Sequence, residues 1–331
     1  MNMIDVDELE KWRGEPLVAF VGVDTFGSAS HAIFDGWARI LDRSWILRGI
    51  DLPLDTSAST YRRLVGAMRA NQAIAGAVVT GHKLRLYAAC ADELVSDDPL
   101  VGLSQETNTL AASAGEVRGY ARDPVSLTHV LPAAPRVISL GAGGAGTALL
   151  LAQGSRDQGT ALFPGGPRPV GTEHMIFVDR DRRALEALRT VATRAGIDQT
   201  RLSFVPVADA TDCDAILADV AGPALVVNAT GLGKDSPGSP VTDRAPFTAE
   251  TVAWDLNYRG DLTFLRQAAR RGARTVDGWD YFVAGWAGAL SAIAGVPFTA
   301  DLLARFRHTA APFRPTAPFR PAAPFRAEEA P

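Results

Sequence analysis

Hydrophobic positions in the first 131 residues follow two different patterns. Short runs of consecutive hydrophobic residues predict buried strands, and longer stretches with hydrophobic residues every three or four positions predict helices. This alternation of strand and helix predicts an α/β domain. The expected strands are 17–23, 45–49 and 76–80, and the expected helices are 30–41, 60–70 and 83–94.

The pattern starts again after Pro132 and Pro135, which mark a linker. We expect a second, Rossmann-type doubly wound domain over 132–279. The first domain, 1–131, is expected to bind substrate and to be completed by a returning helix at 280–308. The expected strands of the second domain are 137–140, 175–178, 202–207, 224–228, 252–256 and 274–277, with a helix at 182–195.

A glycine-rich segment joins the first strand of the second domain to a helix of small residues. Gly141 allows a tight turn, Gly143 lets the backbone approach phosphates, and Gly146 lets the helix pack closely on the strand. The N–H groups and the positive dipole end of the helix then face the anion. The segment, Gly141-Ala142-Gly143-Gly144-Ala145-Gly146, therefore predicts a dinucleotide site and, with it, redox chemistry.

Composition and charge exclude several classes of protein. The 331 residues are 47% hydrophobic and 21% charged, which is ordinary for a globular protein of two domains. The net charge of −4 provides no broad basic surface, so no nucleic-acid partner is expected. The longest hydrophobic run, 282–296, is shorter than the roughly 20 residues that cross a bilayer, so no membrane association is expected.

The two cysteines, Cys90 and Cys213, lie far apart and have no histidine at ligand spacing. This indicates neither a disulfide framework nor a metal site and fits a reducing compartment. The acidic N-terminal segment is unlike a signal peptide, so we expect a cytoplasmic protein.

Two segments fall outside the α/β pattern. Residues 154–172, rich in glycine and proline, are expected to form an enlarged loop. Residues 309–331 repeat APFR three times and are expected to be disordered, because such sequence cannot bury a core. A solvated tail is favoured over a docking role for its Phe-Arg pairs.

Polar residues stand where predicted helices of the first domain begin. Ser28 and Ser30 lie at a helix start, where hydroxyls bind a carboxylate or cap the helix. Lys83 follows a predicted strand in the segment VVTGHK, and the helix dipole there disfavours the ammonium and lowers its pKa. Such a lysine can exchange a proton, although a solvated charge is the commoner role of a lone lysine.

Other short motifs follow in order along the chain. Glu106-Thr107-Asn108-Thr109 precedes Gly119–Asp123, and Asp123-Pro124 read alone is a turn signal. The second domain carries Asn228-Ala229-Thr230, then Asp255-Leu256-Asn257-Tyr258, then Asp277-Gly278. Taken singly, these motifs are also explained as turns around Gly231 and Gly233 and as a core aromatic at Tyr258.

Together, between about residues 18 and 296, these motifs resemble the shikimate/quinate dehydrogenase family. That family carries S-x-S-P, N-V-T-x-P-x-K, A-V-N-T, G-x-N-T-D, I-N-A-T-x-x-G-M, D-x-x-Y and D-G in the same order. The resemblance implies reversible, NAD(P)-dependent hydride transfer at a ring hydroxyl of a small cyclic carboxylate. It implies no metal and is compatible with a homodimer.

The resemblance also implies roles for individual residues. Lys83, paired with Asp123, exchanges the hydroxyl proton. The residues expected to hold the substrate are Ser28, Ser30, Thr80, Asn108 and Tyr258. The residues expected to hold the cofactor are Gly141, Gly143, Gly144, Ala145, Gly146, Asp179, Arg180, Asn228, Ala229, Thr230 and Gly278.

The residues after the predicted strand 175–178 bear on the choice of cofactor. Asp179 can accept hydrogen bonds from the ribose hydroxyls and repel a 2′-phosphate. NADP-using members of the family tend to carry Asn-Arg-Thr where this chain has Asp179-Arg180-Asp181. The resemblance therefore favours NAD over NADP, and Arg180, which could reach a 2′-phosphate, argues the other way.

The chain departs from the family pattern where the family reads ring hydroxyls. The Asn of N-V-T is missing, and the Gln of the last helix aligns with Gly285, next to Trp286. We therefore expect a divergent member that acts on a related hydroxylated carboxylate, with Arg122 beside Asp123 available for an anionic group. Two alternatives remain: a methylene-tetrahydrofolate dehydrogenase of similar layout, and a catalytically silent NAD-binding sensor or regulatory protein.

Overall fold

The computed structural model describes residues 3–154, 172–220, 222–233 and 236–315. These residues form two compact units. Unit 1 contains the described residues up to His129 together with Val283–Arg314, and unit 2 contains those from Val130 to Phe282. Most of the expected loop at 154–172 lies outside the described residues.

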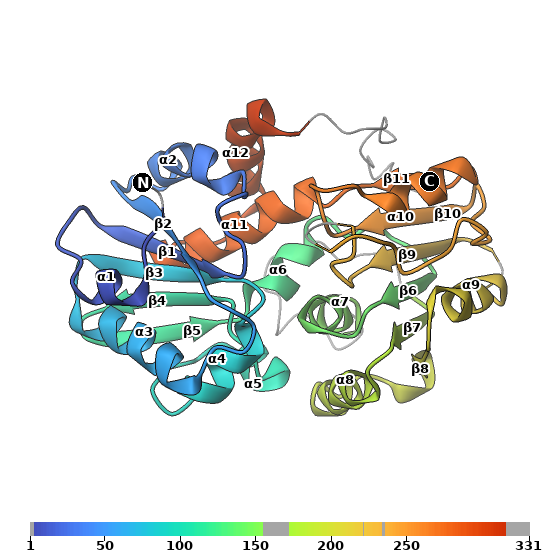
Figure 1. Ribbon diagram of the computed structural model, residues 1–331, viewed down its shortest axis with the longest axis horizontal. Coiled ribbons are helices and arrows are strands. Elements are labelled where there is room, and N and C mark those ends of the chain that lie inside the picture. Colours follow the sequence, from blue (N-terminus) through green and yellow to red (C-terminus); the bar gives the residue numbers. More distant parts are fainter. Residues whose placement is uncertain (1–2, 155–171, 221, 234–235, 316–331) are drawn as a thin grey trace. The chain divides into compact units, whose positions relative to one another are not determined.

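Unit 1 is built around a mixed five-stranded sheet in the order β2-β1-β3-β4-β5 (Figure 1). The first three strands in this order are parallel, while β4 and β5 run antiparallel to their neighbours as a hairpin. All six residues of β1 are buried, as expected for a central strand covered on both faces. The strands are β1 (Leu17–Gly22), β2 (Ile46–Asp51), β3 (Ile74–Val79), β4 (Thr109–Ser113) and β5 (Glu116–Tyr120).

Helices cover both faces of this sheet (Figure 1). On one face, helices α2, α11 and α12 meet through stacked aromatic rings: Trp37 lies 5.7 Å from Trp286 and 5.5 Å from Phe306 between centroids. The helices of unit 1 are α1 (Val6–Glu10), α2 (Ser30–Ile40), α3 (Ala58–Ala70), α4 (Lys83–Cys90), α5 (Pro99–Ser104), α6 (Arg122–Thr128), α11 (Trp279–Ala294, which begins in unit 2) and α12 (Ala300–Ala310).

The C-terminal part of unit 1 differs from the expectation in two respects. The segment 280–308 forms two helices, because Gly295 adopts a φ of 70° and Thr299 caps a new helix by accepting from Leu302 N. The expected disorder from 309 is wrong for the first residues of the tail, since α12 continues to Ala310 and a 3₁₀ turn covers Ala311–Phe313. Residues 316–331 lie outside the described part.

Unit 2 contains a fully parallel six-stranded sheet in the order β11-β10-β9-β6-β7-β8. Counted along the chain, this is the 3-2-1-4-5-6 order of doubly wound dinucleotide-binding domains, so the predicted fold class is confirmed. The strands are β6 (Arg136–Leu140), β7 (His174–Asp179), β8 (Leu202–Pro206), β9 (Ala224–Asn228), β10 (Thr251–Asp255) and β11 (Arg274–Val276). The helices are α7 (Gly144–Gly154), α8 (Arg182–Arg194), α9 (Ala210–Ala218) and α10 (Thr263–Arg270), with a 3₁₀ turn at Gln199–Arg201.

Within the described ranges, none of the helices is both long enough and hydrophobic enough to cross a bilayer.

Candidate active site

The chemistry-bearing residues of unit 1 gather at one edge of its sheet. Strands β1, β2 and β3 are parallel, so their carboxyl ends meet at the same edge. Because β4 is antiparallel to β3, its first residue, Thr109, pairs with Val78 at this edge, and β5 ends beside it at Tyr120. Strand order reverses between β1 and β3, which is where open α/β sheets bind ligands.

Lys83, Asp123 and Asn108 form one hydrogen-bonded group at this edge. Lys83 begins α4, and its Nζ forms an ion pair with Asp123 Oδ2. Asn108 Nδ2 donates to the other oxygen of Asp123 at 2.6 Å. The β4–β5 hairpin produces this proximity, because Asn108 N donates to Tyr120 O just before the chain turns into α6. The structure thus brings together the two expected catalytic residues and one expected substrate-binding residue.

Both side chains of the ion pair are partly shielded from water, at 15% exposure for Lys83 and 12% for Asp123. An ion pair in this intermediate setting is little screened by salt and remains open enough to meet a small molecule. It can therefore exchange a proton with a bound hydroxyl group.

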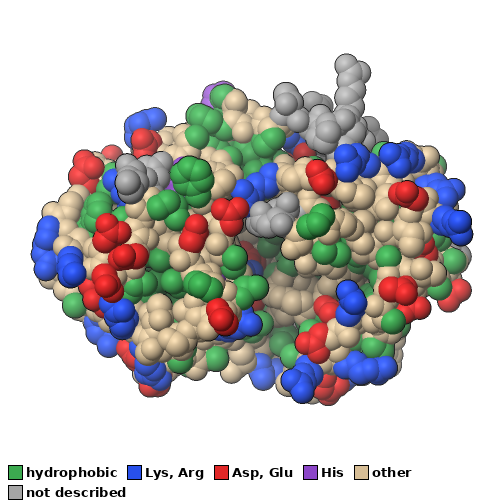
Figure 2. All heavy atoms as spheres, viewed as in Figure 1, with side chains coloured by type: hydrophobic (Ala, Val, Ile, Leu, Met, Phe, Trp, Pro, Cys, Tyr) green, Lys and Arg blue, Asp and Glu red, His purple; other side chains and the backbone are tan. Residues whose placement is uncertain are grey.

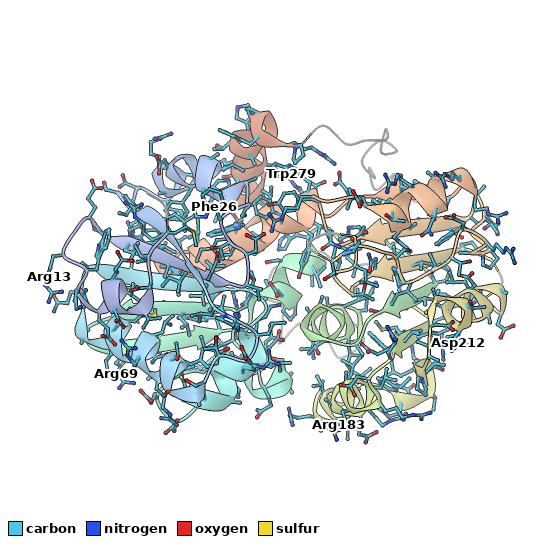
Figure 3. The ribbon with its side chains drawn as sticks, viewed as in Figure 1. Arg13, Phe26, Arg69, Arg183, Asp212 and Trp279 are labelled. Carbon is cyan, nitrogen blue, oxygen red and sulfur yellow. The ribbon has the colours of Figure 1, made fainter. Side chains whose placement is uncertain are left out.

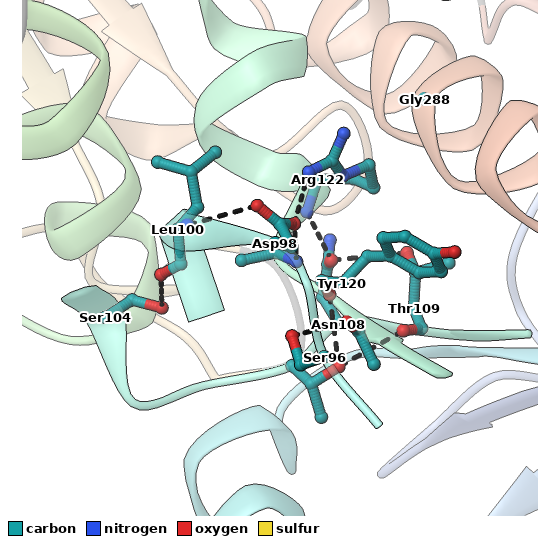
Figure 4. Close-up of polar contacts among 12 residues, drawn as sticks. Ser96, Asp98, Leu100, Ser104, Asn108, Thr109, Tyr120, Arg122 and Gly288 are labelled. Carbon is teal, nitrogen blue, oxygen red and sulfur yellow. Dashed lines mark hydrogen bonds and ion pairs between the residues drawn. The ribbon is translucent and has the colours of Figure 1, made fainter. Parts of the chain in front are cut away.

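Arg122 has a different partner from the anionic ligand expected for it. Its guanidinium pairs with Asp98, whose carboxylate also accepts from Leu100 N at 3.0 Å and from Ala121 N at 2.9 Å (Figure 4). Asp98 thereby caps α5 and fixes the start of α6. Arg122 belongs to this support through its Nη2, which is paired with Asp98.

The two serines at the start of α2 form a hydroxyl pair. Ser30 Oγ donates to Ser28 Oγ at 2.9 Å, and Ser30 N donates to the same oxygen at 3.3 Å. The alternative of Ser30 as the N-cap is wrong, because the N-cap residue is Ala29 and Ser30 is the first helical residue. Ser28 is half-buried and Ser30 is buried, so Ser28 is the more accessible hydroxyl. Thr80 is exposed at the end of β3.

Hydrophobic side chains are exposed at the same edge. Six large hydrophobic residues are exposed in the described part of the chain, and four of these follow the carboxyl ends of β1, β2 or β3: Val23, Phe26, Leu54 and Leu84. Phe26, 71% exposed, lies at the surface of unit 1 (Figure 3), where Figure 2 shows hydrophobic side chains. Hydrophobic groups next to a few polar ones are typical of small-molecule sites.

Glu106 is a residue of this site to which the sequence assigned no role. It is fully buried, and burial raises the pKa of its carboxyl to about 7, an effect that the nearby Lys83 ammonium opposes and Asp123 reinforces. One feature of the sequence could have pointed to it, because Glu106 stands where the family pattern A-V-N-T has alanine.

His82 is a second missed residue, directly before Lys83. Its Nδ1 lies 2.7 Å from the Tyr61 hydroxyl and its Nε2 lies 3.0 Å from Leu52 O. Burial lowers the pKa of this imidazole, so it is neutral at physiological pH. Both ring nitrogens are used, and His82 therefore anchors the turn that presents Lys83.

The glycine-rich turn of unit 2 has the geometry that a pyrophosphate needs. Gly141 has a φ of 115°, and a Cβ on it would lie 2.8 Å from the carbonyl of Ala229. A Cβ on Gly146 would lie 2.6 Å from Gly141 O, whereas Gly143 is exposed and has open space around its Cα. The turn is closed on the protein side and open at Gly143, where α7 begins with half-buried Gly144 and Ala145. These residues fit a dinucleotide.

The turn after β9 lies against the glycine turn and is held by a buried amide. Asn228 Oδ1 accepts from Thr230 Oγ1 at 2.6 Å, and its Nδ2 donates to Leu232 O and to Asp255. Because Asn228 is fully buried, its side chain shapes the turn and leaves half-buried Ala229 and exposed Thr230 for contact with a ligand. Burial raises the pKa of the Asp255 carboxyl to about 7.

Gly278 and Tyr258 have packing contacts within unit 2. A Cβ on Gly278 would lie 2.1 Å from Leu256 O, so only glycine allows the backbone at 278 to pack this closely against the backbone at 256. The Tyr258 ring lies 4.4 Å from Phe282 and 5.3 Å from Trp279 between centroids. Tyr258 is half-buried in this aromatic group, and the serines expected to share its substrate carboxylate belong to unit 1.

Asp179 connects the end of β7 to the glycine turn. Its Oδ2 accepts from Ala142 N at 2.7 Å and its Oδ1 accepts from Asp181 N at 2.9 Å. Each carboxylate oxygen has a further lone pair for a ribose hydroxyl. The adjacent Arg180 is exposed.

Comparison with known proteins finds no matching family model and no matching curated sequence. Solved structures of similar fold include three dehydrogenases. A shikimate dehydrogenase in complex with NADP⁺ is 16% identical, with a TM-score of 0.69 over 91% of this chain and 96% of its own. The quinate dehydrogenase from Corynebacterium glutamicum in complex with NAD is 21% identical, with a TM-score of 0.66 over 90% and 99%. The shikimate 5-dehydrogenase from Thermus thermophilus in complex with NADP(H) and shikimate is 22% identical, with a TM-score of 0.61 over 88% and 99%.

The resemblance carried by the short motifs is therefore confirmed at the level of the fold, over nearly the whole length of these enzymes. This chain has the two-unit fold of the shikimate and quinate dehydrogenases.

Proposed function

We propose that this protein is an NAD-dependent oxidoreductase that acts on a hydroxyl group of a shikimate- or quinate-like carboxylate. The observation that carries the proposal is the Lys83–Asp123–Asn108 group at the point where strand order reverses in unit 1. The fold and the open glycine turn of unit 2 support it.

The bound nicotinamide would accept a hydride from the carbinol carbon during oxidation and return it during reduction. Lys83 as a free amine takes the hydroxyl proton as the carbonyl forms, and as an ammonium it gives the proton back. Asp123 orients Lys83 and stabilises its ammonium form, and Asn108 keeps Asp123 in place through the 2.6 Å hydrogen bond. Proton exchange of this kind contributes roughly 10²–10⁴-fold to rate.

The substrate carboxylate would be held by Ser28, with Ser30 behind it. The role of Tyr258, which belongs to unit 2, stays a prediction from the resemblance. Thr80 and the second N–H of the Asn108 amide would contact ring hydroxyls. Phe26, Leu54 and the other exposed hydrophobic residues at this edge suit the nonpolar faces of a carbon ring.

NAD is the proposed cofactor. Gly143, Gly144 and Ala145 would meet the pyrophosphate at the start of α7, with Gly141 and Gly146 shaping the turn. The oxygens of Asp179 would bind the adenosine ribose and disfavour a 2′-phosphate. Ala229 and Thr230 would lie along the cofactor, while Asn228 and Gly278 support their turns from within.

The substrate is proposed to differ from shikimate at the ring hydroxyls. Gly285 occupies the position aligned with the family's glutamine, and among the described residues a Cβ added there would meet no atom within 4 Å. A site that lacks a hydrogen-bonding group discriminates less well at the hydroxyl that group reads.

No observation favours a silent sensor, which has no use for a shielded Lys–Asp pair. A cytoplasmic location and a homodimer stay predictions.

The test is a panel of cyclic and acyclic hydroxy acids, including shikimate and quinate, with reduction of NAD and NADP followed optically. We expect turnover of at least one hydroxylated carboxylate, with a higher kcat/KM for NAD than for NADP. Tight NAD binding without turnover on the whole panel would contradict the proposal.

A further inference from the structure

A buried carboxyl lies behind the Lys83–Asp123 pair. Glu106 is 0% exposed, and neither of its carboxyl oxygens has a hydrogen-bond partner in the part of the chain that the structure describes. Burying a carboxyl without a partner is costly. The fold nevertheless places one here, immediately before the residues that build the site.

The local backbone fixes where Glu106 lies. Helix α5 ends at Ser104, and its C-cap residue Gln105 adopts the left-handed conformation with a φ of 56° and donates its N–H to Val101 O. Glu106 N then donates to Ser104 Oγ at 3.3 Å. The next residue, Thr107, approaches Lys83 O with its N–H at 3.5 Å. Glu106 is therefore held beside the first turn of α4, with Asn108 two residues further on.

Two charged groups act on Glu106, and they are the members of the proposed catalytic pair. The Lys83 ammonium on α4 attracts its ionised form and the Asp123 carboxylate on α6 repels it. The other charged pair beside α5 and α6, Arg122 with Asp98, is internally neutralised. His82, next to Lys83, is a neutral imidazole bonded to Tyr61.

We propose that Glu106 is a positioning residue that controls the acid–base behaviour of Lys83 through its charge, without touching the substrate. The proposal rests on the role given to Lys83 above. Because Glu106 is fully buried, a substrate cannot reach it, and its effect must pass through its two charged neighbours.

The direction of the effect follows from the charge. Burial raises the Glu106 pKa to about 7, so the carboxyl is neutral in mildly acidic solution and becomes an anion above neutrality. The anion favours the ammonium form of Lys83. It therefore keeps the lysine protonated, and ready to reduce a carbonyl, to a higher pH than the pair with Asp123 alone would.

The test compares Glu106→Gln with the wild-type enzyme in pH profiles of kcat/KM, measured for alcohol oxidation and for carbonyl reduction with the best substrate of the panel. Oxidation gains activity, and reduction loses it, as Lys83 deprotonates. In Glu106→Gln the rising limb of the oxidation profile and the falling limb of the reduction profile are expected to move together to lower pH, by about one pH unit. This is the size of shift expected when a titrating lysine loses a nearby negative charge. Glu106→Asp should restore the wild-type limb, and Glu116→Gln, an exposed carboxylate on β5, should leave it in place.

A uniform loss of activity at all pH values with an unmoved limb would show a merely structural role and overturn the proposal. If Glu106→Gln does not fold, Glu106→Ala, the residue of the family pattern, makes the same comparison. Failure of the proposed function would be seen in a different measurement. In that case Lys83→Met would turn over substrate as fast as the wild type, while the pH dependence of unfolding would still show the titration of the Glu106 carboxyl.

Discussion

Two buried carboxyls, Glu106 in unit 1 and Asp255 in unit 2, should make the folded protein less stable as pH rises from acidic to neutral. Burial raises the pKa of Glu106 from 4.5 to about 7, so the folded state holds a proton that the unfolded state releases above pH 4.5. The stability linked to that proton is fully present below pH 4.5 and is lost as pH rises to 7. At about 1.4 kcal/mol per pKa unit, the loss is on the order of 3 kcal/mol.

The same argument applies to Asp255, whose pKa rises from 3.8 to about 7. The loss between pH 4 and 7 is on the order of 4 kcal/mol. Isosteric amides remove the titration, so the comparison is between the wild type and Glu106→Gln or Asp255→Asn.

Urea unfolding at a series of pH values measures the effect. Hydrogen exchange of peptides from each unit is recorded as well, because a chain of two units need not unfold in one step. The difference in free energy of unfolding, wild type minus variant, should fall by the stated amounts as pH rises from about 4 through 7, and should level off above pH 7. Glu116→Gln, at an exposed position, should give a flat difference. A flat difference for Glu106→Gln as well would refute the reasoning, since it would mean that the carboxyl is not held neutral by burial.

Three substitutions test other parts of the structure. Gly141→Ala should weaken NAD binding and cost about 1–3 kcal/mol of stability, because alanine is strained at a φ of 115° and its Cβ would press on the next turn; unchanged calorimetric NAD affinity would count against the turn geometry. Gly285→Ala should stabilise unit 1 by about 0.5–1 kcal/mol. Gly288→Ala should destabilise it, because a Cβ on Gly288 would lie 2.6 Å from Ser126 Oγ, whereas a Cβ on Gly285 would meet no described atom within 4 Å. Equal shifts of the two variants in thermal unfolding would contradict this. Asp179→Asn should narrow the preference for NAD over NADP by about tenfold or more in kcat/KM, since it removes a charge that repels the 2′-phosphate; an unchanged ratio would assign the preference elsewhere.

Much of the architecture was predictable because buried strands leave a clear signal. The run at 17–23 and the run at 224–228 are hydrophobic at nearly every position, which is typical of central parallel strands. The β4–β5 hairpin was missed because its strands are short and rich in alanine, serine and glycine. Its turn places Ala114 at a φ of 51°, a left-handed conformation that an alanine in the sequence does not predict. Helix α5 has six residues, too few to show a helical period.

The Lys83–Asp123 pair, proposed as catalytic, was predictable from motif order, and the residues that support it were not. The ion pair of Lys83 with Asp123 follows from two motifs that end at the same sheet edge. Glu106 looks in the sequence like any surface glutamate. Its burial depends on the left-handed turn at Gln105, which only the packed structure reveals. Ser30 also looked like a cap, although the helix begins one residue earlier than capping would require.

The central claim is that Lys83 exchanges the proton of the reacting hydroxyl. Its most direct test is turnover of Lys83→Met on the best substrate of the panel, with NAD affinity measured by calorimetry and Arg85→Met, which removes an exposed cation from the same helix, as the control. We expect turnover to fall by about 10²–10⁴-fold with NAD affinity unchanged, and the control to stay fully active. Wild-type turnover by Lys83→Met would contradict the account.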